Sequence, residues 1–527
     1  MPATTYYLRA YAENMAGVGY GEEVVFETSE VAEFELELAA HPSGAGTLSG
    51  AGTYSPGEEI QITAIPEPGY NFMHWSHNGD TLSVWPEFTF TMPGEDVALV
   101  ANFVHDSIKS TDYWFAIPKV TEGHGWGSKS FGFYFVNGNH PNQIRISMPA
   151  DLSFEPIEFF LQPHENLNLN LTDQIQQLWT SSPGAMHNRG FHIESMRKVN
   201  AFFEVGTQNN PDIFSLKGEK SLGKDFYVPF QNTFPSSNNY NPRPYSAIYI
   251  VATEDNTQVT ITPTRPAFPG QPANTPFVIQ LNKGQTYAVA PDDYPNQGQH
   301  PENRLAGTRV QSTKPIAVVM SDDSVAASGC RDLVGDQMVP VSQIGAEYIV
   351  MKGRLTLPEY FYVLATEESQ TTEVFIDGQS VFSLQAGQQA AFEFSESLHH
   401  VETSHPVYLL HMAGFGCEVG GAILPSLENP GQRQIDFTRT RGESFFVNLL
   451  VKSGDEDGFT LNGNPLPAAS FVPVPGAPGW LAGEFQFSVG EVPVHQTSTM
   501  QNSKGTFHMS IINGGNTSGA MYGNFSF

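Results

Sequence analysis

Four related stretches of sequence constrain the fold of this chain more than any other feature. YSAIYIVATEDNTQVTITP (245–263) is echoed by EYFYVLATEESQTTEVFIDG (359–378), and fainter echoes occur at 130–149 and 443–463. Each is an apolar run, a polar turn and a second, alternating run, which is the pattern of a β-hairpin. This self-similarity predicts copies of one unit, each of about six short strands, across residues 111–527.

The copies divide this region into four repeats, and the fold class is all-β. We place the repeats at about 111–235, 236–355, 356–440 and 441–527. A single sheet of that many strands would curl or split, so we expect small β-sandwich-like repeats, packed in tandem or in a closed ring. A propeller blade has only four strands, which favours the sandwich. Aromatic residues make up 12% and charged residues 15% of the chain, a composition typical of ordered strands joined by glycine and proline turns.

The two cysteines of the chain occupy look-alike positions. Cys330 lies in SGCRDLVGDQMVP and Cys417 in FGCEVGGAILP, each just after the closing strand of successive repeats. If neighbouring repeats pack side by side, these loops meet and the thiols form a disulfide, which implies an oxidising compartment. Two free buried cysteines are the alternative.

The N-terminal residues predict a strand pair. TYYLRAYAENMAGVGYGEEVVFETS (5–29) reads as two alternating strands joined by a glycine-rich turn, and two strands alone are only marginally stable in water. The stretch resembles the last two strands of a fibronectin type III domain, which would make residues 1–30 its C-terminal end. On that resemblance, the remaining strands would lie upstream of Met1.

Residues 33–104 form a second, separate module. The motifs GAGTYSPGEEIQITA, GYNFMHW and FTMPGEDVALVANF occur in that order, with Tyr70, Phe72 and Trp75 as a small aromatic core. In these motifs the module resembles the divergent internalin-type B-repeat. The resemblance implies a small β-grasp-like fold and a spacer role in a bacterial surface protein, and it brings no catalytic residue.

The repeats themselves resemble a known family. The motifs STDYWFAIPK, ATEDNTQVTITP, GTRVQSTKPIAVV, GCRDLVGDQMVPVSQIGAEYIV, GCEVGGAILP and FHMSIINGGNTSGAMYGNFSF are similar to the N-terminal domain of IgG Fc-binding protein, over residues 111–527. The animal protein that gives the family its name is a secreted mucus protein that binds antibodies, and bacterial members are exported proteins thought to act in adhesion. The resemblance therefore implies a binding role for residues 111–527. Members often carry cysteine where this chain has Ala520.

Charge narrows the range of partners. Asp and Glu total 55 against 25 Lys and Arg, a formal charge of −30, which argues against nucleic acid. No apolar run is long enough to span a membrane. The start of the chain lacks the pattern of an export signal, and no anchor is visible. We therefore expect an extracellular or bacterial cell-surface location with the export signal and anchor outside this sequence.

An acidic stretch is the best candidate for a cation site. MSDDSVAASGCRDLVGDQ places Asp322, Asp323, Asp332 and Asp336 close together in sequence, and calcium prefers several such oxygens on a loop. The spacing fits no EF-hand. The alternative is an acidic loop that caps strand ends, and we expect no cofactor other than calcium.

A histidine cluster is a weaker metal candidate. SLHHVETSHPVYLLH carries His399, His400, His405 and His411, and zinc would need three or four of these nitrogens to converge. His399 and His400 are neighbours on an extended segment and face opposite ways. Turn or surface histidines are the expected alternative.

Other chemistry is less defined. The patterns of a serine hydrolase elbow, a zinc protease, a P-loop and a dinucleotide fold are missing, so we expect no enzyme. Paired carboxylates of a hydrolase have no sequence spacing to recognise. His124, Trp126 and Trp480 lie in glycine-rich loops, where an aromatic ring stacks on a sugar or plugs the end of a sandwich.

These observations favour an extracellular adhesion protein. We expect it to bind a host or environmental glycoprotein, glycan or protein non-covalently over a broad surface. The alternatives are a purely structural stalk or filament module and a secreted polysaccharide- or peptide-degrading enzyme.

Overall fold

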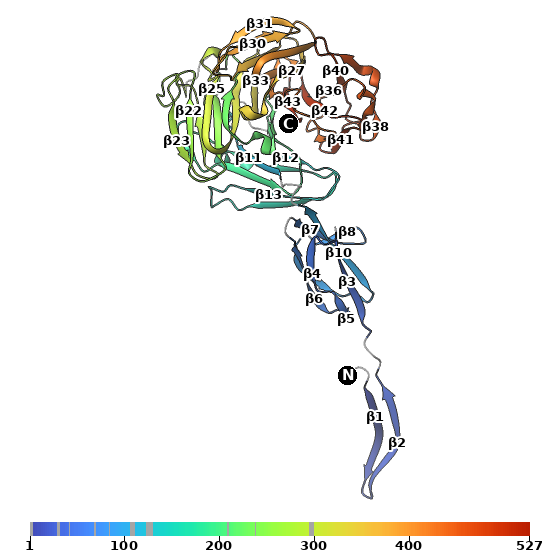
Figure 1. Ribbon diagram of the computed structural model, residues 1–527. Helices are drawn as coiled ribbons and strands as arrows, with labels where there is room; N and C mark the ends of the chain where they lie inside the picture. The colour runs from blue at the N-terminus through green and yellow to red at the C-terminus, as the bar shows by residue number, and fades with distance from the viewer. Residues whose placement is uncertain are drawn as a thin grey trace. The chain divides into compact units, whose positions relative to one another are not determined.

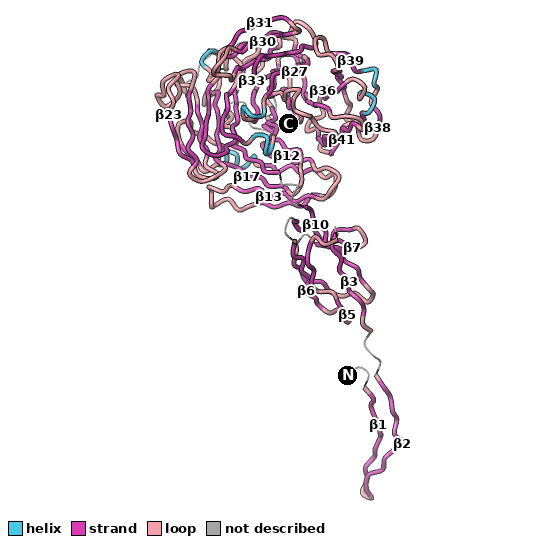
Figure 2. The backbone as a smooth tube through the Cα atoms, viewed as in Figure 1, coloured by secondary structure: helices cyan, strands magenta, loops and turns pink. Residues whose placement is uncertain are grey.

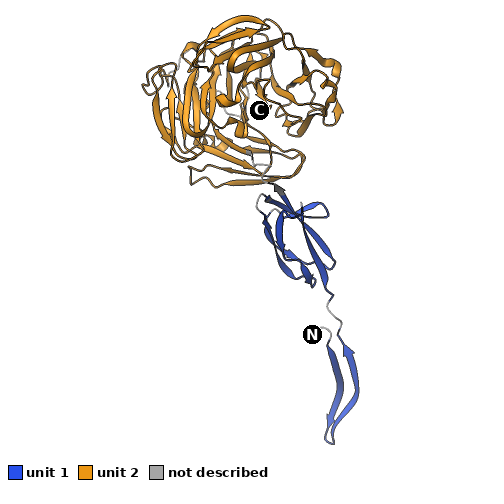
Figure 3. Cartoon of the chain, viewed as in Figure 1, with its two compact units in different colours: residues 1–109 blue, residues 110–527 orange. Residues whose placement is uncertain are grey.

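The protein is nearly all β, as predicted, and its strands fall into several separate sheets (Figure 2). The computed structural model describes residues 4–28, 32–41, 43–67, 70–83, 85–105, 111–122, 130–207, 210–237, 239–294 and 300–526. The helices in this part of the chain are single turns, and none of them is long and apolar enough to cross a membrane. Two compact parts, Met1–Lys109 and Ser110–Phe527, are described separately (Figure 3).

The N-terminal part contains a hairpin and a small two-sheet domain. The hairpin pairs β1 (Thr5–Asn14) with β2 (Gly17–Glu27) antiparallel, and their side chains are exposed. In the domain, sheet β5-β3-β10-β7-β8 and sheet β4-β6-β9 share one core around the fully buried Trp75. The strands are β3 (Phe34–His41), β4 (Gly46–Ser49), β5 (Gly52–Tyr54), β6 (Glu59–Pro66), β7 (Tyr70–His77), β8 (Asp80–Ser83), β9 (Glu87–Thr91) and β10 (Val97–His105).

The C-terminal part contains four repeats with one strand plan. In repeat 1, sheet A has the order β11-β17-β13-β14 and sheet B the order β15-β12-β18-β19. The same positions are filled in repeat 4 by β35-β41-β37-β38 and β40-β36-β42-β43. In repeats 2 and 3 a single long strand, β25 or β33, runs from sheet A into sheet B and joins the two. Each repeat therefore has eight strand positions.

The elements follow in chain order. Repeat 1 has β11 (Thr111–Ala116), β12 (Ser130–Val136), β13 (Asn142–Ser147), β14 (Ile157–Leu161), β15 (Asn166–Asn170), η2 (Thr172–Gln174), α1 (Ile175–Leu178), β16 (Met186–His187), β17 (Gly190–Ser195), β18 (Asn200–Gly206), β19 (Asp212–Leu216) and η3 (Gly218–Ser221). Repeat 2 has β20 (Gly223–Val228), β21 (Ser246–Ala252), β22 (Thr257–Thr262), β23 (Phe277–Leu281), β24 (Thr286–Val289), η4 (Pro301–Asn303), β25 (Thr308–Val325) and β26 (Asp332–Gln337), followed by η5 (Val341–Gln343).

The second half follows the same order. Repeat 3 has β27 (Gly345–Met351), β28 (Arg354–Leu355), β29 (Tyr360–Ala365), β30 (Thr372–Ile376), β31 (Gln379–Leu384), β32 (Gln389–Glu393), β33 (Leu398–Gly416) and β34 (Glu418–Ile423). Repeat 4 has β35 (Gln434–Thr438), β36 (Ser444–Lys452), η6 (Glu456–Gly458), β37 (Phe459–Leu461), β38 (Asn464–Pro465), η7 (Ala468–Ser470), β39 (Phe471–Pro473), β40 (Trp480–Gln486), β41 (Thr497–Asn502), β42 (Phe507–Gly515) and β43 (Gly519–Asn524).

The two sheets of a repeat differ in burial. Strand β25 mixes buried and partly exposed residues up to Pro315, where it lies in sheet A, and is continuously buried from Ile316 onward, where it lies in sheet B. Alternating buried and exposed residues are typical of a sheet with one solvent-exposed face. A continuous apolar run is typical of a strand that is covered on both faces. Sheet B is therefore the layer that neighbouring repeats cover.

The last strands of the four repeats meet at a common axis. Strand β19 lies against β26, β26 against β34, β34 against β43, and β43 against β19. Gly421 permits the close approach of β34 to β26, because an added Cβ at this position would lie 2.5 Å from the side chain of Val334. The repeats form a closed ring, and the colour in Figure 1 runs around it from teal to red. We name β19, β26, β34 and β43 the axial strands.

Repeats 1 and 4 complete the ring through a shared apolar core and through polar contacts. The side chain of Arg441 donates to the carbonyl of Thr207 at 2.6 Å, and Asn166 donates to the carbonyl of His495 at 2.9 Å. The N–H of Tyr522 on β43 donates to the carboxylate of Asp212 on β19.

The observed repeats differ from the predicted ones in strand number and boundaries. Strands β20, β27 and β35 pair with the sheets of the repeat that follows them, so the repeats do not end at 235, 355 and 440. Their strands span 111–216, 223–337, 345–423 and 434–524. Each repeat has eight strand positions instead of about six, and in repeats 2 and 3 the long strand β25 or β33 fills two of them.

Candidate ligand-binding site

A pocket of about 680 Å³ lies between repeats 2 and 3. Repeat 2 contributes loop residues around β22, β23 and η4, and repeat 3 contributes the turn between β31 and β32. The lining residues are Asn232, Thr264, Arg265, Asn274, Pro301, Glu302, Arg304, Ala306, Leu384, Gln385, Ala386, Gly387, Gln388 and Gln389. We call this the inter-repeat pocket.

Side-chain amides dominate the exposed lining of this pocket. Asn232, Asn274, Gln385 and Gln388 are exposed, and each amide both donates and accepts hydrogen bonds. Arg265 adds an exposed cation to a chain with a net charge of −30. A small number of fixed polar groups in a concave site is typical of specific ligand binding.

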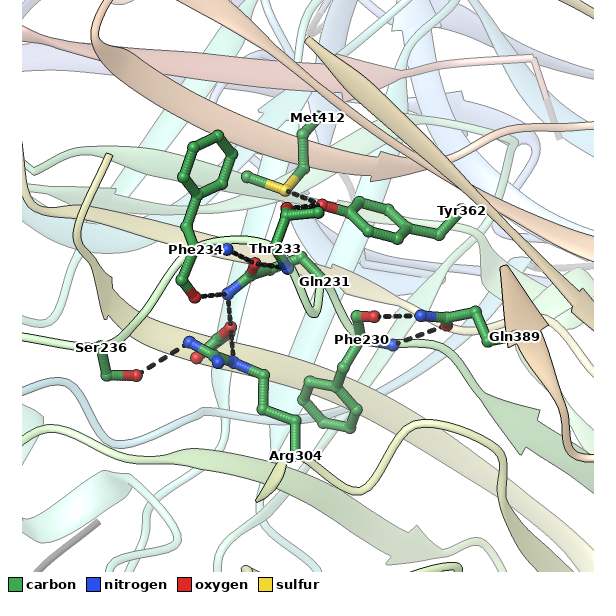
Figure 4. Close-up of polar contacts among 10 residues, drawn as sticks. Phe230, Gln231, Thr233, Phe234, Ser236, Arg304, Tyr362, Gln389 and Met412 are labelled. Atoms are coloured by element: carbon green, nitrogen blue, oxygen red, sulfur yellow. Dashed lines mark hydrogen bonds and ion pairs between the residues drawn. The ribbon is translucent and has the colours of Figure 1, made fainter. Parts of the chain in front are cut away.

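A buried ion pair supports the wall of the pocket. Arg304 pairs through Nε with Asp322. Its Nη2 donates to the hydroxyl of Ser236 at 2.9 Å (Figure 4). Gln231 donates to the same carboxylate at 2.8 Å. Burial raises the pKa of Asp322, and the guanidinium of Arg304 opposes that rise. The network holds the Arg304 side chain in one orientation.

The loop that follows β20 in repeat 2 is hydrogen-bonded to repeat 3. The side-chain amide of Gln389 donates to the carbonyl of Phe230 at 2.6 Å and accepts from its N–H at 3.2 Å (Figure 4). The hydroxyls of Thr233 and Tyr362 are hydrogen-bonded. Both walls of the pocket are thus linked, which fixes its shape before any ligand arrives.

Two junctions of the ring have the same kind of glycine contact, and the inter-repeat pocket lies at one of them. At repeats 2 and 3 the turn containing Gly387 lies against Gly307, which has a φ of +82° and where a Cβ would lie 1.9 Å from the carbonyl oxygen of Gly387. At repeats 1 and 2 the equivalent turn contacts Gly190, whose N–H donates to the carbonyl of Gly284 at 2.9 Å. A second pocket of about 390 Å³ lies at that junction, between residues 145–156 and Lys283.

The two cysteines connect repeats 2 and 3 on the axial side of this junction. Cys330 and Cys417 form a disulfide with a Cα–Cα distance of 5.6 Å, and both are half-buried. Each precedes an axial strand, β26 or β34, and the contact of these strands brings the sulfurs together. The alternative of two free buried cysteines does not describe this structure.

The four aspartates of the acidic stretch are buried in separate environments. Asp322 pairs with Arg304, and Asp336 with Lys217. Asp323 accepts hydrogen bonds from the N–H of Thr121 at 2.6 Å and from the hydroxyl of Ser324. Asp332 lies beside the carboxyl group of Glu418. They neither converge on one point nor form a surface loop, because this stretch is the end of β25 and the axial strand β26.

The histidine cluster divides into separate acid–histidine pairs. His399 contacts Asp377 at 2.6 Å, His400 contacts Glu347 at 2.9 Å, and His411 contacts Glu359 at 3.0 Å. All three histidines are buried, so the expectation of turn or surface histidines is wrong for them. Within the described ranges, one set of three metal-type ligand atoms converges, from Cys330, Cys417 and Glu418, and its two sulfurs are the disulfide.

The aromatic candidates do not form a site in the described residues. Trp480 is buried against Ile349, Val474 and Ala477, and the Nζ of Lys452 lies 3.9 Å from its ring centroid. It fills a core rather than presenting a free face. His124 and Trp126 lie outside the described residues.

Sequence reasoning missed the residues of the inter-repeat pocket. Its side chains come from loops of two different repeats, and no motif joins them. The recurring Gly-Gln turn, NKGQ at 282–285 and QAGQ at 385–388, is a sequence signal that could have located the junction.

Comparisons with known proteins place the ring in a family. The family model described as IgGFc binding protein matches residues 214–514, more than half of the chain. The chain belongs to the IgGFc-binding protein family. The match begins in β19 and ends in β42, so repeat 1 shares the strand plan while lying almost wholly outside the matched residues.

Other matches are narrower. Residues 36–107 match the model of the divergent InlB B-repeat domain, which agrees with the resemblance seen in the sequence. No curated protein matches the chain. Among solved structures, two B repeat units of the collagen binding protein of Staphylococcus aureus match at 8% identity, over 80% of this chain and 100% of that one. The TM-score of 0.12 does not establish a shared fold.

Proposed function

We propose that this protein is an extracellular or cell-surface binding protein that recognises a glycan, mucin or protein ligand without covalent chemistry. The ring of four repeats is the binding part, and the inter-repeat pocket is its contact site. The B-repeat domain is a spacer, and the β1–β2 hairpin is the end of a fibronectin type III domain. We propose a bacterial surface as the location and no enzymatic activity.

The inter-repeat pocket is the observation that carries this proposal. Its exposed amides and Arg265 suit hydroxyl, carbonyl and acidic groups, which sugars and peptides both present. Its walls are held by the Arg304 and Gln389 networks, and a preformed site loses less entropy when a ligand binds. The family match supports a binding role in general.

Binding to defined probes tests the proposal. The full chain would be screened against an array of neutral and acidic glycans, purified mucin and immobilised IgG Fc fragment. For a probe that binds, the double variant Arg265→Ala/Gln388→Ala should weaken binding about tenfold or more, as expected when central contacts are removed. Gln176→Ala, an exposed residue in repeat 1, is the matched control and should leave binding unchanged. Equal binding by both variants would place the site elsewhere, and failure of every probe would contradict the binding role.

A structural role is the second candidate, favoured by the B-repeat match. In that case the ring and the spacer lengthen a stalk or filament and bind no separate ligand. Ordered self-assembly of the full chain, seen by electron microscopy and independent of the pocket residues, would support this role over binding.

A further inference from the structure

The axial strands bring two carboxyl groups from different repeats into direct contact. Asp332 begins β26 in repeat 2, and Glu418 begins β34 in repeat 3. Both residues are buried, and their carboxyl groups lie beside one another. Two carboxyl groups can share a hydrogen bond only if one of them holds a proton.

The pair adjoins the disulfide that joins these repeats. Glu418 directly follows Cys417, Asp332 lies two residues after Cys330, and a carboxylate oxygen of Glu418 lies within 4.8 Å of both sulfurs. A change in the charge of the pair therefore acts at the disulfide.

The charges around the pair favour its protonated form. From β19, Asp212 faces Asp332 and raises its pKa further, and Asp212 is itself buried with a raised pKa. Tyr240 lies near Arg331, Asp323 and Asp332, and Arg331 is hydrogen-bonded to Ser237 and to the carbonyl of Cys330. Strand β43 contributes Tyr522, which is hydrogen-bonded to His411. Among the described residues, neither Asp332 nor Glu418 has a cation as an ion-pair partner.

We propose that the Asp332–Glu418 pair is a proton-dependent latch between repeats 2 and 3. While the pair holds a proton, its hydrogen bond closes the junction over the disulfide. When both carboxyls are ionised, two buried like charges repel one another and the junction opens locally. Coupled groups of this kind lose their protons in two steps whose pKa values belong to the pair. The latch is closed while at least one proton remains and opens after the second step.

The direction of the pH effect follows from burial. Desolvation is the largest cause that raises the pKa of Asp332 and of Glu418, and the contact of the two carboxyls adds to it for Asp332. In the unfolded chain both groups lose their protons near the ordinary carboxyl values of 3.8 and 4.5. The folded state therefore holds an extra proton above that range, and the junction is strongest in acid and weakens as pH rises through the folded pKa values.

Reduction of the disulfide by a phosphine reports on the latch locally. The full-length protein would be treated with the phosphine between about pH 5 and pH 8, and the appearance of free thiols would be followed. Wild-type protein should be reduced about tenfold faster at the alkaline end, which is the effect of one pKa unit on the opening equilibrium. In Glu418→Gln and in Asp332→Asn the amide donates to the remaining carboxylate at every pH, so the rate should stay nearly constant.

A second variant separates the latch from the other buried acids. Asp323→Asn removes a different buried carboxyl group and should leave the pH dependence of the reduction rate unchanged. The same slope for wild type, Glu418→Gln and Asp332→Asn would overturn the latch. So would protection by calcium of wild-type protein alone, because the pair would then hold a cation instead of a proton.

Discussion

Two junctions of the ring differ in the buried charged groups that meet at the axial strands. One holds a cation and an acid, and the other holds two acids. Between repeats 1 and 2, the Nζ of Lys217 lies 2.7 Å from the carboxylate of Asp336, with both side chains about 1% exposed. Between repeats 2 and 3, Asp332 meets Glu418, a second acid. The strand plan is shared, so backbone architecture alone does not dictate the chemistry of a junction. Burial lowers the pKa of Lys217 and raises that of Asp336, and each charge opposes the shift of the other. In the like pair, Glu418 raises the pKa of Asp332 further instead of opposing the effect of burial.

Removing the buried cation should have the largest effect. Lys217→Met leaves Asp336 buried without its counter-charge, and breaking a buried pair in this way costs about 3–5 kcal/mol of unfolding free energy. Chemical denaturation at neutral pH measures this loss. Lys217→Met/Asp336→Asn is the control and should recover part of the stability, because the unpaired charge is gone. Equal stability of the two variants would show that the ion pair is not the feature that matters.

A pH-dependent contribution is expected at Asp323, which joins repeat 2 to Thr121 of repeat 1. Burial raises its pKa from 3.8 to about 7. The contribution of Asp323 to the free energy of unfolding is therefore greatest in acid. It falls as pH rises from about 4 to 7, by on the order of 4 kcal/mol at most. Asp323→Asn should flatten thermal unfolding profiles recorded across this range. A profile with the wild-type slope would contradict the burial of an ionisable group at this position.

Loss of the disulfide should weaken one junction and leave the other intact. Cys330→Ser/Cys417→Ser removes a link across 87 residues, and disulfides typically contribute about 2–4 kcal/mol. Hydrogen exchange should rise in β26 and β34 and stay unchanged around Lys217. Uniform exchange changes over all four repeats would mean that the ring responds as one cooperative unit, contrary to the distinction between its junctions.

A glycine substitution should give a smaller effect that is specific to a junction. Gly307→Ala places a Cβ against the carbonyl of Gly387, at a positive φ, and we expect a loss of about 2–3 kcal/mol. Gly378→Ala is the matched control, since Gly378 also has a positive φ, of +77°, but nothing within 4 Å of the added Cβ. It should lose about 1 kcal/mol, from backbone strain alone. Similar losses for the two variants in denaturant unfolding would show that the junction yields to the added methyl group.

The sequence predicted the fold class and the repeats because both are encoded in local patterns. Alternating strands and their echoes, such as 245–263 and 359–378, are visible without a structure. The first strand of each repeat was assigned to the preceding one, since pairing between β20 and β25 depends on contacts distant in sequence. The equivalent cysteines likewise pointed to the one disulfide that the structure contains.

Burial of polar residues was the part that local patterns did not encode. Asp332 and Asp336 resemble a loop motif, but they lie on an axial strand that three other repeats cover. His399 and His400 resemble exposed residues, yet each is buried beside an acid. The inter-repeat pocket depends on the packing of two repeats, so its residues carry no shared signature.

An experimental structure of the full chain at a resolution that shows side chains tests the central claim most directly. The closed ring predicts β19 beside β43, with the N–H of Tyr522 on the carboxylate of Asp212. It also predicts Asp332 in contact with Glu418 next to the Cys330–Cys417 disulfide. Repeats 1 and 4 lying apart, or axial strands that do not meet, would contradict the ring and the account built on it.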